Sequence, residues 1–248
     1  MTVYLVGAGP GDPELLTLKG ARVLASADVV VHDRLVSAEL LDLAPPGCER
    51  ISAAKAPRRP TMTQDEINAL LVERGLRGQS VVRLKGGDPC VFARGGEEAA
   101  ALMAAGVPFE IVPGISSAIA APAYAGIPVT LRHEALSVTI VTGHEDPASG
   151  RTVDWESIAR TGGTIVVLMG AGRAAKIAAR LVAAGLAATT PAAWVNWGTT
   201  REQAVWRGPL VELGLEPVPT PSVLVVGAVA GVDVSWFAEL GRSAASGS

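Results

Sequence analysis

Short runs that are nearly all apolar alternate with stretches rich in alanine and leucine along almost the whole chain. The apolar runs do not alternate with polar residues, which is typical of strands that are covered on both faces. The predicted strands are residues 3–6, 29–31, 81–84, 110–112, 138–142, 165–169, 192–196 and 223–226. Strand–helix alternation over the full length predicts an α/β architecture.

Helix boundaries and a central junction divide this pattern further. Thr63 and Glu66 have the spacing of a capping box, and the alanine-rich stretches 97–105 and 174–184 each stop at a glycine. Proline and glycine meet in residues 112–114, near the middle of the chain. We therefore expect two α/β domains, 1–113 and 114–242, followed by a small polar tail, 243–248, that is disordered.

The composition of the chain limits the classes of protein to which it can belong. The 248 residues are 49% hydrophobic and 18% charged, and the net charge is −3, so we expect a globular protein without a nucleic-acid partner. The longest apolar stretch, 223–232, is too short to span a membrane, and the N-terminus lacks a basic leader region, so we expect no membrane partner. Two cysteines and three histidines without ligand spacing predict a cytoplasmic protein with neither disulfides nor a metal.

A glycine cluster, GAGPGDP at 7–13, follows the first predicted strand and precedes a helix. Glycines at that place let a ligand approach the backbone closely, although a tight turn without a ligand would use them too. The third glycine comes one residue too early for the dinucleotide fingerprint, and Pro10 interrupts the turn, so we reject a nicotinamide site. Lys85 precedes its glycines, which excludes a Walker motif there.

Three further motifs lie at predicted strand or helix ends. In RLKGGDP, 83–89, Asp88 follows two glycines and is placed to pair with an ammonium or a ribose, unless it only starts a turn. In RGGEE, 94–98, Glu97 and Glu98 favour a helix N-terminus, whereas a buried Arg94–Glu97 pair in a cleft would be a substrate contact. In VPGISSA, 112–118, a serine caps a helix, or free N–H groups hold a carboxylate.

Together these motifs resemble the tetrapyrrole methylase family. The matching segments are 7–20, 27–37, 82–88, 94–98, 113–117, 123–128, 141–144 and, weakly, 198–200. The runs DRLV at 33–36 and RGGEE at 94–98 match the uroporphyrinogen branch of the family best. The resemblance covers most of the chain and is densest up to His144.

The resemblance implies two α/β domains with the active site in the cleft between them, and a homodimer. It implies S-adenosyl-L-methionine as cofactor, leaving as S-adenosyl-L-homocysteine. The implied cofactor contacts are Pro10, Gly86, Gly87, Asp88, Val91, Ser116, Ser117, Met169 and Gly198. It makes Asp33 a candidate proton acceptor and Lys55 a candidate proton donor, with Arg94, Glu97 and Arg132 facing the substrate.

The implied reaction is C-methylation of uroporphyrinogen III at carbons 2 and 7, which gives precorrin-2 for sirohaem, cobalamin or haem d1 synthesis. A base near the pyrrole N–H would make the ring carbon electron-rich, and cations would meet the substrate's carboxylates. The available cations are Arg34, Lys55, Arg58, Arg59, Arg94 and Arg132. The alternatives are a methylase of a later precorrin intermediate, a methylase of protein or ribosomal RNA, and a non-catalytic S-adenosylmethionine-binding module.

Overall fold

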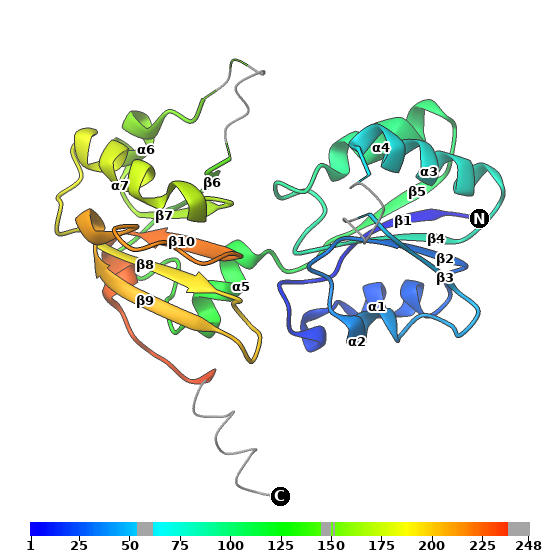
Figure 1. The fold of residues 1–248 in the computed structure, drawn as a ribbon, viewed down its shortest axis with the longest axis horizontal. Coiled ribbons are helices and arrows are strands. Elements are labelled where there is room, and N and C mark those ends of the chain that lie inside the picture. The colour runs from blue at the N-terminus through cyan, green and yellow to red at the C-terminus, as the bar shows by residue number, and fades with distance from the viewer. Residues whose placement is uncertain (54–61, 145–149, 151, 238–248) are drawn as a thin grey trace, which may run out of the picture. The chain divides into compact units, whose positions relative to one another are not determined.

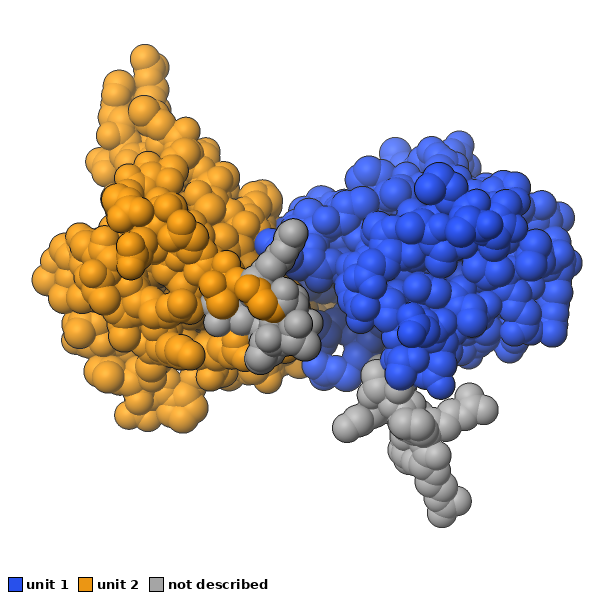
Figure 2. Space-filling view, turned by 90° about the horizontal axis from the view of Figure 1, so that it is seen from above, with its two compact units in different colours: residues 1–116 blue, residues 117–248 orange. Residues whose placement is uncertain are grey.

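The computed structural model describes residues 1–53, 62–144, 150 and 152–237 (Figure 1). Internal contacts divide the chain into two compact units, Met1–Ser116 and Ser117–Ser248, which Figure 2 shows in separate colours. Each unit contains one five-stranded sheet with helices, so the α/β class predicted from the sequence is confirmed. The predicted disordered tail, 243–248, lies outside the described residues.

The first unit is built on a parallel sheet with the strand order β3-β2-β4-β1-β5. Its strands are β1 (Val3–Gly7), β2 (Val29–His32), β3 (Glu49–Ser52), β4 (Val81–Lys85) and β5 (Phe109–Val112). Its helices are α1 (Leu18–Leu24), α2 (Ala38–Leu41), α3 (Gln64–Leu76), α4 (Gly95–Ala104) and a short 3-10 turn η1 (Pro13–Leu15). Helices α1 and α2 cover one face of the sheet, and α3 and α4 cover the other (Figure 1).

Strand β4, in the middle of this sheet, shows how both faces are buried. Val82 and Leu84 pack with the side chains of α1 and α2, whereas Val81 packs with those of α3 and α4. Because side chains alternate along a strand, Arg83 and Lys85 share the face of Val81. Both are almost completely buried, so this central strand carries two cations into the core beneath α3 and α4.

The second unit has a mixed sheet with the order β6-β7-β10-β8-β9. Strands β6 and β7 are parallel, and β10 runs antiparallel to both β7 and β8. The strands are β6 (Val138–Thr142), β7 (Thr164–Leu168), β8 (Pro191–Asn196), β9 (Ala204–Pro209) and β10 (Ser222–Val226). The helices are α5 (Ser117–Tyr124), α6 (Trp155–Thr161) and α7 (Ala174–Ala183), with 3-10 turns η3 (Ala171–Arg173), η4 (Leu210–Glu212) and η5 (Ala228–Gly231).

All eight predicted strands are present, and the sequence pattern missed β3 and β9. Both are edge strands, and neither has a fully buried residue. The other two edge strands, β5 and β6, each keep a short apolar pair, Ile111–Val112 and Ile140–Val141, and were predicted; β3 instead begins with two charged residues, and Arg207 interrupts β9. Within the described ranges, no helix is both long enough and apolar enough to cross a bilayer.

Candidate functional site

Three glycine-containing loops meet at the carboxyl edge of the first sheet, where parallel strands all end on the same side. The loop after β1 pairs with the loop after β4, since Gly87 N donates to Gly9 O at 2.7 Å and Gly9 N donates to Gly87 O at 3.2 Å. A Cβ on Gly7 would lie 2.5 Å from Gly114 Cα, and a Cβ on Gly114 would lie 2.4 Å from Gly87 O. These glycines are therefore required for the three backbones to pack against one another.

Gly86 differs from its neighbours in this junction. A Cβ added there would meet nothing nearer than Leu35 Cβ at 3.9 Å, and its φ is not in the left-handed region. Neither close packing nor backbone strain accounts for a glycine at this position. The bare backbone instead faces open space at the strand edge, where a ligand can reach it.

The side chain of Asp88 connects two of the three loops through hydrogen bonds. Its Oδ1 accepts a hydrogen bond from Cys90 N at 2.7 Å, and its Oδ2 accepts one from Gly114 N at 3.0 Å. The carboxylate thus ties the loop after β4 to the loop after β5 across 26 residues of sequence. The sequence indicated only a ligand contact or a turn for Asp88, so its hydrogen bonds between the two loops were not predicted; its contact with a cofactor stays a prediction.

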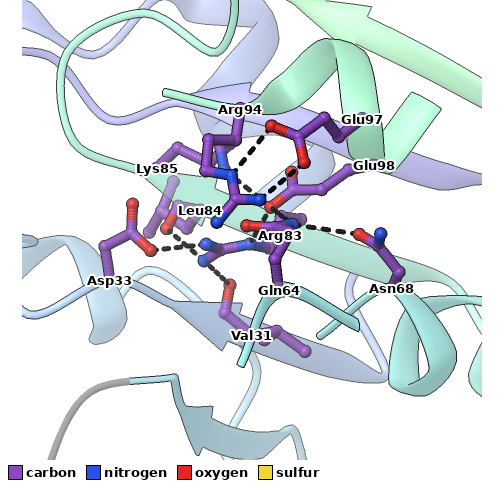
Figure 3. Close-up of polar contacts among 10 residues, drawn as sticks. All are labelled: Val31, Asp33, Gln64, Asn68, Arg83, Leu84, Lys85, Arg94, Glu97 and Glu98. Carbon is purple, nitrogen blue, oxygen red and sulfur yellow. Dashed lines mark hydrogen bonds and ion pairs between the residues drawn. The ribbon is translucent and has the colours of Figure 1, made fainter. Parts of the chain in front are cut away.

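The last residues of β4, which immediately precede Gly86, belong to a buried ion network (Figure 3). Glu98 of α4 has no exposed surface, and its Oε1 accepts from Arg83 Nε at 3.1 Å, from Lys85 Nζ at 2.7 Å and from Gln64 Nε2 at 3.3 Å. Its Oε2 is buried and has no hydrogen-bond partner among the described residues. Burial, reinforced by the neighbouring Arg83, lowers the pKa of Lys85 from its usual value.

Asp33 joins this network from the end of β2. Its backbone N–H donates to Leu84 O at 3.1 Å, and its Oδ1 accepts from Arg83 Nη2 at 2.5 Å. The side chain of Asp33 remains 34% exposed, whereas that of Arg83 is 3% exposed. Asp33 is therefore the part of the network that solvent, or a substrate, can reach.

Arg83, Lys85 and Glu98 were not predicted from the sequence as site residues. A signal for them existed, because two cations stand at alternate positions of a strand whose other residues are apolar and buried. Charged residues are almost never fully buried unless they are paired. Such cations in a central strand indicate a buried carboxylate elsewhere in the chain.

Arg94 and Glu97 form a second ion pair at the start of α4 (Figure 3). Arg94 Nε and Nη2 donate to the two oxygens of Glu97 at 2.8 and 2.6 Å, and both side chains are more than half exposed. The hydrogen bonds from Arg94 lower the pKa of Glu97 from its usual value. Arg94 has a left-handed φ of 59°, so the chain turns sharply at this residue.

The second unit has its own strained strand edge. Strands β6, β7 and β8 run parallel to one another, so their carboxyl ends share one edge of the mixed sheet. Three non-glycine residues with left-handed φ values follow β7 and β8, namely Met169 at 55°, Trp197 at 44° and Thr199 at 73°. Such strain clusters at functional sites. Met169 and Gly198, both expected at the cofactor, therefore lie at the same edge.

Packing within the second unit accounts for one of these two residues, Gly198. A Cβ on Gly198 would lie 2.4 Å from Ala121 Cβ of α5, so glycine is required there by the protein itself. Met169 is 53% exposed and therefore is not the core filler that its residue type would suggest. Its side chain is open to solvent directly after a buried strand.

The remaining predicted site residues are more scattered. Pro10 and Val91 are half-buried in the loops after β1 and β4, and Ser116 and Ser117 are half-buried where the two units join in sequence. Arg132 is exposed in the turn closed by the Leu131–Ala135 bridge, and Arg34 is exposed beside Asp33. Lys55, Arg58 and Arg59 lie outside the described residues.

Comparison with known proteins assigns the family. The model of the tetrapyrrole (corrin/porphyrin) methylases matches residues 2–214, so the chain belongs to this family. A relative from Methanosarcina barkeri, the S-adenosyl-L-methionine-dependent uroporphyrinogen III methyltransferase, is 50% identical over 92% of this chain and 91% of its own length. Siroheme synthase 1 of Yersinia enterocolitica is 49% identical over 96% of this chain, which spans only 51% of that protein.

A solved structure supports the same assignment. The crystal structure of uroporphyrin-III C-methyltransferase from Thermus thermophilus, complexed with S-adenosyl homocysteine, is 42% identical and has a TM-score of 0.80. The match covers 92% of this chain and 98% of that one. The resemblance inferred from the glycine and charged motifs is therefore confirmed at the level of the family and the fold.

Proposed function

We propose that this chain is an S-adenosyl-L-methionine-dependent C-methyltransferase that methylates uroporphyrinogen III at carbons 2 and 7 to give precorrin-2. The observation that carries the proposal is the carboxyl edge of the first sheet, where β4 is followed by the open backbone of Gly86 and β2 is followed by Asp33, a partly exposed carboxylate anchored to a buried ion network. The names of the relatives from Methanosarcina and Thermus support the same activity. The product would enter sirohaem, cobalamin or haem d1 synthesis.

The residues at this edge fit S-adenosylmethionine. The glycines there place the backbones of three loops in contact, and Gly86 leaves a surface that no side chain covers. When bound, the cofactor supplies an electrophilic methyl group on a sulfonium. Asp88 holds the loops after β4 and β5 in one arrangement, so a binding surface would exist before the ligand arrives. Pro10, Gly87, Val91, Ser116, Ser117, Met169 and Gly198 are further proposed contacts.

Asp33 is the proposed proton acceptor. The attacking ring carbon becomes more electron-rich as the pyrrole N–H loses its proton, so a carboxylate near that nitrogen promotes the methylation. Arg83 engages Oδ1 of Asp33, and within the described part of the chain no hydrogen bond reaches Oδ2. We propose that this second oxygen accepts the proton from the substrate. Lys55 stays a predicted proton donor.

Arg94, with Glu97, and Arg132 are proposed to bind the substrate. The bidentate contact with Glu97 fixes the plane of the Arg94 guanidinium at the surface, and such a fixed fork suits carboxylate recognition. The tetrapyrrole carries many carboxylates, and exposed arginines are suited to pair with them even in a protein of net negative charge. We also propose a cytoplasmic homodimer.

An anaerobic assay with S-adenosylmethionine and uroporphyrinogen III tests the function, with absorbance and product mass as readouts. We expect the addition of two methyl groups. Binding of S-adenosylmethionine without methyl transfer would instead favour the non-catalytic binding module, and methylation of only a later precorrin would favour the related methylase. Asp33→Asn should retain cofactor affinity and lose roughly 10²–10⁴ in single-turnover rate. A rate within about threefold of wild type would remove Asp33 from the mechanism.

A further inference from the structure

Arg83 is the residue through which the buried network and Asp33 are connected. One edge of its guanidinium meets Glu98 at 3.1 Å through Nε, and Nη2 meets Asp33 at 2.5 Å (Figure 3). Nη1 lies 3.4 Å from Val31 O, at the strand that precedes Asp33. The side chain is 3% exposed, so its position is determined by protein contacts and not by solvent.

Charge explains why Asp33 is drawn to this place. Arg83 and Lys85 are two buried cations that share one fully buried carboxylate, Glu98. A buried charge without a partner is costly, so a second carboxylate is favoured near the pair. Asp33 is that carboxylate, and 50 residues of sequence separate it from Arg83.

We propose that Arg83 is a positioning residue that holds the Asp33 carboxylate in the orientation needed for proton acceptance. The inference rests on the proposed function, in which Asp33 takes the proton. A lysine at this position would keep the positive charge, but its single ammonium cannot replace a planar fork that contacts Glu98 and Asp33 through different nitrogens. The partly exposed Asp33 side chain would then turn toward water.

Arg83→Lys is the test variant, and Arg74→Lys is its matched control. Arg74 of α3 makes a similar pair of contacts, to the two oxygens of Glu49 at 2.8 and 2.9 Å, without touching Asp33. In single-turnover methylation we expect Arg83→Lys to lose roughly 10²-fold in rate, the loss that a small misplacement of a reacting group can cause. Arg74→Lys should stay within about threefold of wild type, and both variants should bind S-adenosylhomocysteine normally.

A double-variant cycle separates positioning from a general structural effect. If Arg83 acts through Asp33, then Arg83→Lys should slow the Asp33→Asn enzyme no further. Rate losses that add in full, or an Arg83→Lys enzyme as fast as wild type, would overturn the proposal.

Two other outcomes remain decisive. Should Arg83→Lys fail to fold, Glu98→Asp serves in the same cycle, because it keeps the charge of the anchor and withdraws it from Arg83. We then expect Glu98→Asp to lower the methylation rate of the enzyme that retains Asp33 and to leave the rate of the Asp33→Asn enzyme unchanged. A wild-type chain that methylates no uroporphyrinogen III would overturn the proposed function itself. If wild type is active and the Arg83→Lys or Glu98→Asp variant methylates as fast, only the role of Arg83 is overturned.

Discussion

Replacing Gly86 by alanine, which adds one methyl group, should weaken cofactor binding without lowering the stability of the fold. The backbone there accepts an alanine, because φ is not left-handed and the nearest atom to the new Cβ would be Leu35 Cβ at 3.9 Å. Alanine also restricts the unfolded chain, which typically stabilises a protein by about 0.4–1 kcal/mol. We therefore expect Gly86→Ala to unfold at an equal or slightly higher denaturant concentration than wild type.

Cofactor affinity should change in the opposite direction. Carbon atoms in contact lie about 3.5–4.0 Å apart, so a ligand atom resting on the Gly86 backbone would be displaced by the added methyl. We expect the dissociation constant of S-adenosylhomocysteine to rise at least tenfold, which corresponds to about 1.4 kcal/mol. Titration calorimetry on the folded variant measures this directly.

Two other glycines provide the controls. Gly47, in the exposed loop between α2 and β3, also has nothing within 4 Å of where a Cβ would lie and no left-handed φ, so Gly47→Ala should show the same small gain in stability and leave affinity unchanged. Gly114→Ala would force its Cβ to within 2.4 Å of Gly87 O. Overpacking of this kind costs about 1–3 kcal/mol, so this variant should lose stability first. Unchanged affinity in a stable Gly86→Ala variant would refute the placement of the cofactor at this edge.

Three further outcomes follow from the buried network and the cysteines. Glu98→Ala leaves two buried cations without their shared carboxylate and should lower the free energy of unfolding by about 3–5 kcal/mol in urea titrations. Burial lowers the pKa of Lys85 from 10.5, so the unfolded chain binds more protons than the folded protein as the pH rises toward 10.5. The free energy of unfolding of wild type should therefore rise with pH relative to that of Lys85→Met. Parallel curves of stability against pH for the two proteins would contradict this. Burial raises the pKa of the half-buried Cys48 thiol, so iodoacetamide at pH 8 should alkylate the exposed Cys90 first, as peptide mass spectrometry would report.

The sequence contained enough local information for the class of fold and for the family. Continuous apolar runs such as those of β7 and β10 are almost wholly buried, because central strands are covered on both faces. The capping box at Thr63 and Glu66 is present as predicted, since its hydrogen bonds connect residues only three positions apart. Patterns of this kind depend on neighbours in the chain and can be read without coordinates.

The roles of individual site residues were decided by contacts between distant parts of the chain. The sequence marked several glycines as ligand-binding candidates, but only the packed loops distinguish Gly114, which another backbone requires, from Gly86, which faces open space. The ion pair between Asp33 and Arg83 likewise spans 50 residues. By itself the sequence determined the buried strands, the α/β class and the family; the tertiary structure decided which charges share a low-dielectric interior, because only folding brings them together.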